Sequence, residues 1–554
     1  MSIFRRKKIE GIAPGEPMVW FSGMWLGFGI LMIVALLWII LTNGLATFWP
    51  SRVVQVALVE GSAASLKDSS VLAGEVRKEQ VKRVSGTGGE PVAEIQLFVG
   101  NREAYNTGFR YVDETDIKER TYPEDILLAE RLEYGDLLGY PVRLELEGGR
   151  TVESSTKAMR DELRRVVKES NQRRKKIKHI EKKLIGGINR EMKSLEMELR
   201  SAEMKGDVPA DLEERVARER EELQVRYEEL AGEARTLRER QNEETFVYRL
   251  ATGEERSMAT GSLVSFYYPN QLGVFGRVTH FFAGIWNFLS EDPREANTEG
   301  GVFPAIFGTF VMTLLMSVAV VPFGVLSAIY LREYSKQGPF VRSVRIAVNN
   351  LAGVPSIVFG VFGLGFFVYF VGGSIDSLFF PERFPTPTYG TGGILWASLT
   401  LALMTVPVVI VSTEEALAAV PRGAREASLA TGASKWQTIQ RIVLPASVPG
   451  MITGLVLAMA RGAGEVAPLM LVGVVKLAPA LPLDSIAPFF HFERKFMHLG
   501  FHIYDLGFQS PDSEAAKPMV FATTLLLIAL VVALNAAAIL IRERLRRKYA
   551  TSAF

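Results

Sequence analysis

Six long apolar stretches alternate with polar segments along the chain. The uncharged runs cover residues 17–51, 300–331, 346–375, 384–413 and 518–541, and a further run, 442–475, is interrupted only by Arg461 and Glu465. Each run exceeds the roughly 20 residues that a helix needs to cross the hydrocarbon core of a bilayer. The pattern predicts a mostly α-helical, polytopic membrane protein with six transmembrane helices.

Lysine and arginine residues gather at both ends of the chain and in two loops between the runs. The terminal groups are Arg5, Arg6, Lys7 and Lys8 before the first run, and Arg542, Arg544, Arg546, Arg547 and Lys548 after the last. The loops at 332–345 and 422–441 are basic as well. Since cytoplasmic loops carry an excess of basic residues, we expect these loops and both termini in the cytoplasm and residues 52–299 outside it. The first run is too long for the apolar part of a signal peptide, so we interpret it, with residues 1–50, as a cytoplasmic tail and an uncleaved first span.

Residues 51–265 form a separate unit that lacks long apolar runs. Short β-like runs occur in it at 53–59, 93–99, 142–146, 246–250 and 262–268. Such runs, bounded by glycine and charged clusters, are typical of strands. We therefore expect a small β-containing module whose two halves flank an inserted segment.

The inserted segment, about residues 155–245, has the pattern of two long helices. Apolar residues mostly recur three or four positions apart, with dense Lys, Arg and Glu between them. The sequence Lys-Gly-Asp-Val-Pro at 205–209 predicts a turn between two arms. Fully helical arms would be about 75 and 50 Å long. The segment is predicted to be an antiparallel helical hairpin, with Gly186-Gly187 as the weak point of the longer arm.

Residues 266–299 connect this module to the remaining spans. Residues 274–289 place aromatic and aliphatic side chains on a helix that is too short and too polar to span. This composition favours an amphipathic helix at the membrane interface. The remaining region, 300–545, holds the second to sixth spans and a polar loop at 413–450.

The polar loop between the fourth and fifth spans carries several local structure signals. Ser412 with Glu415 and Ser434 with Gln437 have capping-box spacing. Gly432 stands where a C-terminal glycine would end a short helix. The signals predict a compact knob of capped helices and a glycine turn that can press into a groove of a partner.

The same loop carries a family resemblance. It contains Glu426-Ala427-Ser428, three further residues, Gly432, nine further residues and then Ile442-Val443-Leu444-Pro445. This spacing resembles the EAA loop of binding-protein-dependent ABC importer permeases. The stretches at 307–334, 349–367, 425–445 and 449–471 are similar to the PstA-type permeases of phosphate importers.

The resemblance implies a permease subunit that forms half of a phosphate translocation path in a bacterial inner membrane, with the insertion in the periplasm. The residues it assigns to docking of the ATPase are Glu426, Ala427, Ser428, Gly432, Ile442, Leu444 and Pro445. The partners it implies are a second, PstC-like permease, PstB-like ATP-binding subunits and a periplasmic phosphate-binding protein, together with membrane lipid.

Arg461 and Glu465 are the charged residues inside an otherwise apolar run. Each charge costs on the order of 3 kcal/mol at the centre of a bilayer, so both must face protein or water. At i,i+4 spacing they would share one helix face and pair. They are either a neutralised pair that holds two spans together or an anion-contacting arginine with a carboxylate that limits how tightly the anion is held. We favour the second interpretation, because the family has R-x-x-x-E in this span, although it usually has Thr where this chain has Val466.

The sequence has no motif for ATP hydrolysis, for a catalytic triad or for a cysteine metal site. There is no GxxxxGK[ST] phosphate loop, so ATP is expected to be hydrolysed by a separate subunit and no cofactor to be bound directly. No Ser/His/Asp constellation indicates a catalytic site, and a net charge of +2 gives no indication of nucleic acid binding. Cysteine is absent, and His491, His498 and His502 are expected to be ordinary loop histidines and not a metal site.

Two alternatives to a phosphate permease remain open on the sequence. The first is the same machinery for another oxyanion, such as phosphonate, molybdate or sulfate. The second is a membrane-anchored coiled-coil scaffold in which the transport core is inactive.

Overall fold

The structure, a computed structural model, describes residues 17–66, 69–82, 91–153, 157–206, 208–484 and 487–550. The basic residues at positions 5–8 and Asp207 of the predicted turn lie outside the described residues. The side chains of Arg546 and Lys548 are likewise not described.

Six helical segments among the described residues are long and apolar enough to cross a membrane, as predicted. Three are formed by α1 (Pro17–Ala46), α11 (Ile394–Ala418) and α17 (Ser513–Ala550). The other three include π-helical segments: α7 (Phe303–Ile329) with η7 (Tyr330–Tyr334); α9 (Ser356–Phe362), η8 (Gly363–Gly372) and α10 (Gly373–Phe379); and α13 (Lys435–Thr438), η10 (Ile439–Val443) and α14 (Leu444–Gly464).

The helix α11 lies at the centre of the bundle, in contact with α7 and α14. Its residues Trp396 and Leu401 are buried in a cluster that includes Met316 of α7. η8 can approach α11 closely at Gly363 because glycine has no side chain. A Cβ at this position would lie 2.2 Å from Oγ1 of Thr400 in α11. Apolar side chains and small residues therefore set the spacing of the spans.

Two of the predicted apolar runs are not single helices. The first part of 346–375 belongs to a separate helix, α8 (Pro339–Leu351), and the run 442–475 breaks after Gly464. Its last part forms the short helix α15 (Leu469–Val472). Pro355 and Pro468 stand in the two breaks, and a proline has no N–H to continue a helical hydrogen-bond ladder.

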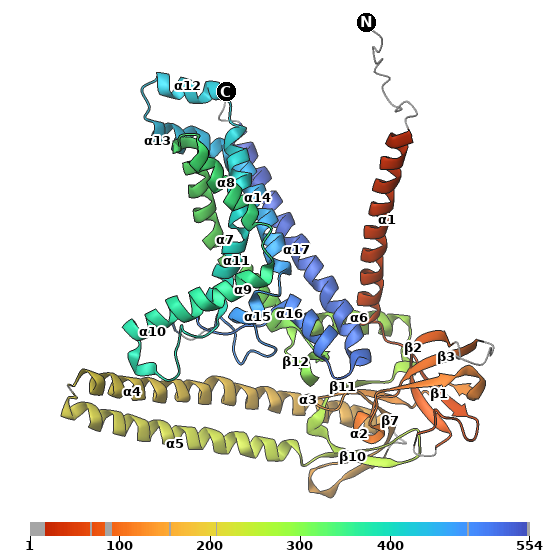
Figure 1. Ribbon diagram of the computed structural model, residues 1–554. Coiled ribbons are helices and arrows are strands. Elements are labelled where there is room, and N and C mark those ends of the chain that lie inside the picture. The colour runs from red at the N-terminus through yellow and green to blue at the C-terminus, as the bar shows by residue number, and fades with distance from the viewer. Residues whose placement is uncertain are drawn as a thin grey trace.

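The bundle has two different ends (Figure 1). The helices α12 (Arg422–Ala430) and α13 lie at one end, together with the first residues of α1 and the last residues of α17. The strands and the long hairpin lie at the other end. We call residues 419–443 the knob and the two ends the knob end and the module end. The basic loops and the insertion therefore lie at opposite ends of the molecule.

The module contains two antiparallel sheets among the described residues. The first has the order β4-β3-β2-β1-β5, with bounds β1 (Val53–Leu58), β2 (Val71–Lys82), β3 (Val92–Phe98), β4 (Phe109–Asp113) and β5 (Ile117–Thr121). The second has the order β10-β9-β7-β6-β11, with β8 on β7; its bounds are β6 (Leu127–Arg131), β7 (Leu137–Glu145), β8 (Thr151–Glu153), β9 (Thr245–Arg249), β10 (Glu255–Ala259) and β11 (Leu263–Tyr267). A short helix, α2 (Arg102–Tyr105), follows β3.

The second sheet joins chain segments that lie on both sides of the hairpin. Leu144 of β7 is opposite Phe246 of β9, and Ala129 of β6 is opposite Phe266 of β11. Because β6 and β7 precede the hairpin and β9 and β11 follow it, the predicted module with flanking halves is confirmed.

The insertion is an antiparallel helical hairpin, as predicted. One arm runs through α3 (Lys157–His179), the π-helical η3 (Ile180–Ile185) and α4 (Gly186–Lys205), and the other is α5 (Ala210–Gln241). Ile188 and Leu195 of the first arm pack with Leu212 and Leu223 of the second. The beginning of α3 packs instead on the second sheet, where Leu163 is buried.

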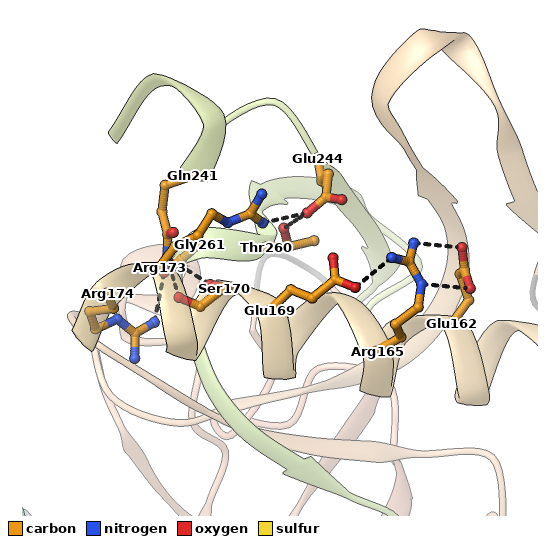
Figure 2. Close-up of polar contacts among 10 residues, drawn as sticks. All are labelled: Glu162, Arg165, Glu169, Ser170, Arg173, Arg174, Gln241, Glu244, Thr260 and Gly261. Carbon is orange, nitrogen blue, oxygen red and sulfur yellow. Dashed lines mark hydrogen bonds and ion pairs between the residues drawn. The ribbon is translucent and has the colours of Figure 1, made fainter. Parts of the chain in front are cut away.

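Polar contacts fix the base of the hairpin to the module (Figure 2). Arg173 Nη2 donates to Glu244 Oε2 at 2.9 Å, and Arg174 Nη2 donates to the carbonyl of Gly261 at 2.8 Å. Gln241, the last residue of α5, donates to Ser170 Oγ at 2.6 Å. Both arms are therefore attached to each other and to the strand region at their common base.

The segment 291–300 joins the module, the hairpin and the bundle. It follows the amphipathic helix α6 (Val274–Ser290) and contains the two-residue strands β12 (Pro293–Arg294) and β13 (Glu299–Gly300). Asp292 pairs with Lys178 of the hairpin, and Arg294 pairs with Glu130 of the module. Asn297 Nδ2 donates to Asp505 Oδ2, near the start of the sixth span, at 3.2 Å. Each of these partners belongs to a different part of the molecule.

Two carboxyl groups at this junction have raised pKa values. Burial, together with the neighbouring carboxylates of Asp136 and Glu130, raises the pKa of Glu299 to about 9. Burial and the charges of Glu130 and Glu75 raise the pKa of Asp136 to about 7. The folded state therefore holds these protons more tightly than the unfolded chain does.

The junction is expected to lose stability as the pH rises. The stability that these protons contribute is fully present below the pKa values that the two carboxyl groups have in the unfolded chain. It is lost as the pH rises through their pKa values in the folded protein, about 7 for Asp136 and about 9 for Glu299. Hydrogen exchange in 127–139 and 293–300, corrected for the intrinsic pH dependence of exchange, would measure this. Glu299→Gln should remove the upper part of the dependence, and Glu119→Gln, at an exposed position on β5, should not. Constant protection of the unmodified protein over this pH range would contradict the prediction.

Candidate docking and translocation sites

The knob contains the glycine turn that the sequence predicts. Gly432 has a φ of 87°, which L-residues with side chains rarely adopt. Its N–H donates to the carbonyl of Leu429 at 3.0 Å, and the N–H of Ala433 donates to that of Ser428 at 3.2 Å. These hydrogen bonds end α12 in a Schellman-type turn.

Buried hydroxyl groups join the two short helices of the knob. Ser428 Oγ lies 2.9 Å from Oγ1 of Thr438. Ser434 and Gln437 form the predicted capping box at the start of α13. The other predicted box, Ser412 with Glu415, is wrong, because both residues lie inside α11. The helix continues there because later residues such as Leu417 are buried against neighbouring helices.

The knob is attached to the second span. Arg425 Nη1 lies 2.5 Å from Oε1 of Glu333 in η7, and Lys435 donates to the Glu333 carbonyl. Ile439 and Val443 are buried with residues of α7 and α11. Ile442, Leu444 and Pro445 are half-buried at the base of the knob. Four residues of the predicted docking set are therefore buried or half-buried and hold the knob in place: Ser428, Ile442, Leu444 and Pro445.

The exposed part of the knob combines charge with apolar surface. Glu426, Ala427 and Gly432 are exposed, as docking requires. Leu429 and Trp436 beside them are 49% and 50% exposed. The sequence interpretation missed these two residues, although a tryptophan and a leucine in a charged loop are a detectable signal. An exposed aromatic and an aliphatic side chain framed by charges are suited to a protein interface.

Arg461 and Glu465 form the predicted pair, with a different backbone geometry. Arg461 Nε lies 3.5 Å from Glu465 Oε1. Arg461 is in the last turn of α14, but Glu465 is extended, with φ −79° and ψ 137°. The two residues therefore do not share a helix face, and they lie at the module end of the span and not at its centre.

The pair lies at the end of an unburied face of α14. Thr453, Leu457, Arg461 and Gly464 follow one another at helical spacing, and Leu457 is 61% exposed. The opposite face packs on α7, where a Cβ at Gly462 would lie 2.5 Å from Met316 Sδ. A charged group on an exposed face of a membrane span must meet protein or water, since contact with lipid is costly. This face is therefore a candidate for contact with a second subunit or with a solute path.

A buried polar group lies at the same end of the bundle. His498 and His502, at the short helix α16 (Leu499–Tyr504), are almost fully buried, and burial lowers the pKa of each to about 4. Lys476 Nζ lies 3.0 Å from Asp505 Oδ2, which also accepts from Asn297. These histidines are not the ordinary loop residues that the sequence suggested. His498 Nδ1 accepts from the N–H groups of Gly500 and Phe501 at the start of α16. The contacts of Asp505 with Lys476 and Asn297 join segments that are distant in the chain, which no local pattern indicates.

No group of three or more His, Cys, Asp or Glu side chains within the described ranges could hold a metal ion. The residues present at the two sites offer charged and apolar surface for recognition: the pair Arg461–Glu465 at one, and Glu426, Leu429 and Trp436 at the other.

Comparison with known proteins relates the bundle to one family. The family described as binding-protein-dependent transport system inner membrane component matches residues 320–549. The PstA phosphate transport system permease of Mycobacterium leprae is 42% identical over 200 residues, which cover 36% of this chain and 59% of the relative. PstA 1 of Mycobacterium tuberculosis is 35% identical over 260 residues, covering 47% of this chain and 76% of the relative.

A solved structure of the MetNI methionine ABC transporter in an inward-facing conformation is similar at 21% identity and a TM-score of 0.33. The match covers 47% of this chain and 97% of that one. The module and the hairpin lie outside the residues that the permease family matches.

Proposed function

This chain belongs to the PstA-type permeases of binding-protein-dependent transport systems, and on that premise we propose that it is the transmembrane permease subunit of an ATP-driven importer of inorganic phosphate. The observation that carries the proposal is Arg461, held beside Glu465 at the end of an exposed face of a membrane span. An arginine presents several N–H donors to an oxyanion, and a neighbouring carboxylate weakens binding enough for release. Phosphate is the solute named for the mycobacterial relatives.

The unburied face of α14 supports a second permease subunit as a partner. In this proposal each permease contributes half of the path, and Arg461 lies between them. The knob would dock separate ATP-binding subunits through Glu426, Ala427, Leu429 and Trp436, since these side chains are exposed at the knob end. A soluble phosphate-binding protein would deliver the solute at the module end. The protein would lie in a bacterial inner membrane, with both termini in the cytoplasm and the module in the periplasm.

Transport by the reconstituted complex tests this proposal. We expect phosphate uptake that requires ATP, this chain and the phosphate-binding protein. Excess unlabelled phosphate should compete with labelled phosphate, whereas sulfate, molybdate and phosphonate should compete at least tenfold less well. If another oxyanion competes more strongly than phosphate does, that oxyanion is the solute. ATP-dependent uptake that is unchanged without this chain would favour the scaffold interpretation.

A further inference from the structure

The hairpin lies across the module end of the bundle and does not project freely away from it (Figure 1). Its first arm is held near the base by the pair Lys178–Asp292. Further along, α4 contacts the short segment η9 (Pro381–Arg383) between the third and fourth spans. Together with the polar contacts at the base (Figure 2), these contacts make the hairpin a fixed part of the surface at this end.

An open cleft of about 1290 Å³ lies between the hairpin and the loops at the module end. Residues of both arms of the hairpin form one wall, between Arg190 and Lys205 on the first arm and between Pro209 and Arg215 on the second. The other wall comes from residues in 380–383, between the third and fourth spans, and in 487–493, between the fifth and sixth spans. A partner that approaches this side of the permease therefore meets the hairpin and the loops together.

The hairpin wall has an excess of positive charge. Arg215 is paired with Glu198. Arg190, Lys193 and Lys205 are exposed and have no ion-pair partner within the described part of the chain. On the opposite wall, Glu493 lies 3.5 Å from His491, and Glu382 is next to Arg383. With Arg215, these cations outnumber the carboxylates of Glu198 and Asp211 on the hairpin wall, whereas the opposite wall has Glu382 and Glu493 against Arg383.

Between the cleft-lining residues Pro488 and His491, the loop carries two exposed aromatic side chains, one of them in a constrained backbone conformation. Phe489 and Phe490 are 56% and 50% exposed, and Phe489 has a φ of 67°. Asp484 holds the loop, since its carboxylate lies 3.2 Å from His491 Nε2 and 2.5 Å from Arg494 Nη1. A bulky residue with positive φ is strained, and its surroundings must maintain that conformation. Rigid, exposed aromatic side chains are characteristic of residues that dominate protein interfaces.

We propose that this cleft is the docking surface for the soluble solute-binding subunit of the importer. Carboxylates on that subunit would pair with Arg190, Lys193 and Lys205, and an apolar contact would cover Phe489 and Phe490. The inference rests on the proposed function, because only an importer needs a partner that delivers solute at this end. The hairpin then extends the docking surface beyond the loops of the permease.

Charge reversal on the hairpin tests the electrostatic part. In the full importer complex, Lys193→Glu with Lys205→Glu should weaken binding of the purified phosphate-binding protein at least tenfold, with a smaller effect at high salt. The matched control is Arg218→Glu with Arg226→Glu, which makes the same charge change at exposed positions of α5 outside the cleft. The control should bind as the unmodified complex does. Equal binding by both variants would overturn the proposal.

A change at Phe489 separates docking from folding. Phe489→Gly should relieve strain in the loop, because glycine accepts a positive φ, yet it should weaken docking. A photo-crosslinker at Ser201, inside the cleft, should capture the phosphate-binding protein, and one at Val225, on α5 outside it, should not. Capture of a second copy of this chain or of lipid at Ser201 would overturn the proposal. If unmodified complexes transport phosphate but the variants still bind the phosphate-binding protein normally, the proposed docking surface is wrong and the proposed function stands. If unmodified complexes bind no phosphate-binding protein, the proposed function fails as well.

Discussion

Replacing Gly432 with valine is expected to release the ATP-binding subunits from the permease and to lower phosphate uptake at least tenfold. Gly432 has a φ of 87°, and a β-branched residue in this conformation is strained by about 1–3 kcal/mol. No atom lies within 4 Å of the Cβ that a substitution would add, so the effect comes from the backbone and not from a clash. The turn orients α12 and its exposed residues Glu426 and Leu429. Co-purification of the ATP-binding subunits and uptake in the same preparation would measure the effect.

Two control variants separate the turn from the surface of the knob. Gly432→Asn should keep most binding, because asparagine tolerates the left-handed conformation. Gly423→Ala, at an open helical position of α12, should have no effect. Normal uptake and normal subunit content in Gly432→Val would show that the knob does not dock the ATPase.

Replacing Arg461 with alanine is expected to abolish uptake in complexes that are intact and still bind ATP. The change removes the guanidinium group at the end of the exposed face of α14, where an anion would be contacted. Arg342→Ala is the control, since Arg342 is an exposed arginine on α8. Uptake, subunit content and ATP binding should be measured on the same preparations.

The double change Arg461→Leu and Glu465→Leu distinguishes transport from structure. A pair that only holds the fold should tolerate loss of both charges better than loss of one, because the single change leaves an unpaired charge in a partly buried site. If Arg461 contacts phosphate, the double variant should remain inactive. Uptake close to that of the unmodified protein in intact complexes would leave Arg461 and Glu465 a structural pair.

Local chemistry made part of the candidate site predictable. The Gly432 turn and the Ser434–Gln437 capping box depend on residues within a few positions of each other, and both are present. The same reasoning failed at Ser412, because burial of Leu417 against neighbouring helices continues α11 through the expected cap. Leu429 and Trp436 were missed because exposure at a knob depends on which side of each short helix packs against the bundle.

The sequence by itself determined the six spans, the strand-like runs and the hairpin. Run length, residue type and apolar spacing act over one element, so each could be recognised without its neighbours. Only the tertiary structure decided that β7 pairs with β9 across the hairpin, that Glu465 leaves the helix of Arg461, and that Asn297 meets Asp505. It also decided that the hairpin lies against the loops at the module end and leaves a cleft there. These features depend on contacts between residues that are far apart in the chain, and such contacts leave no periodic signal in a single sequence.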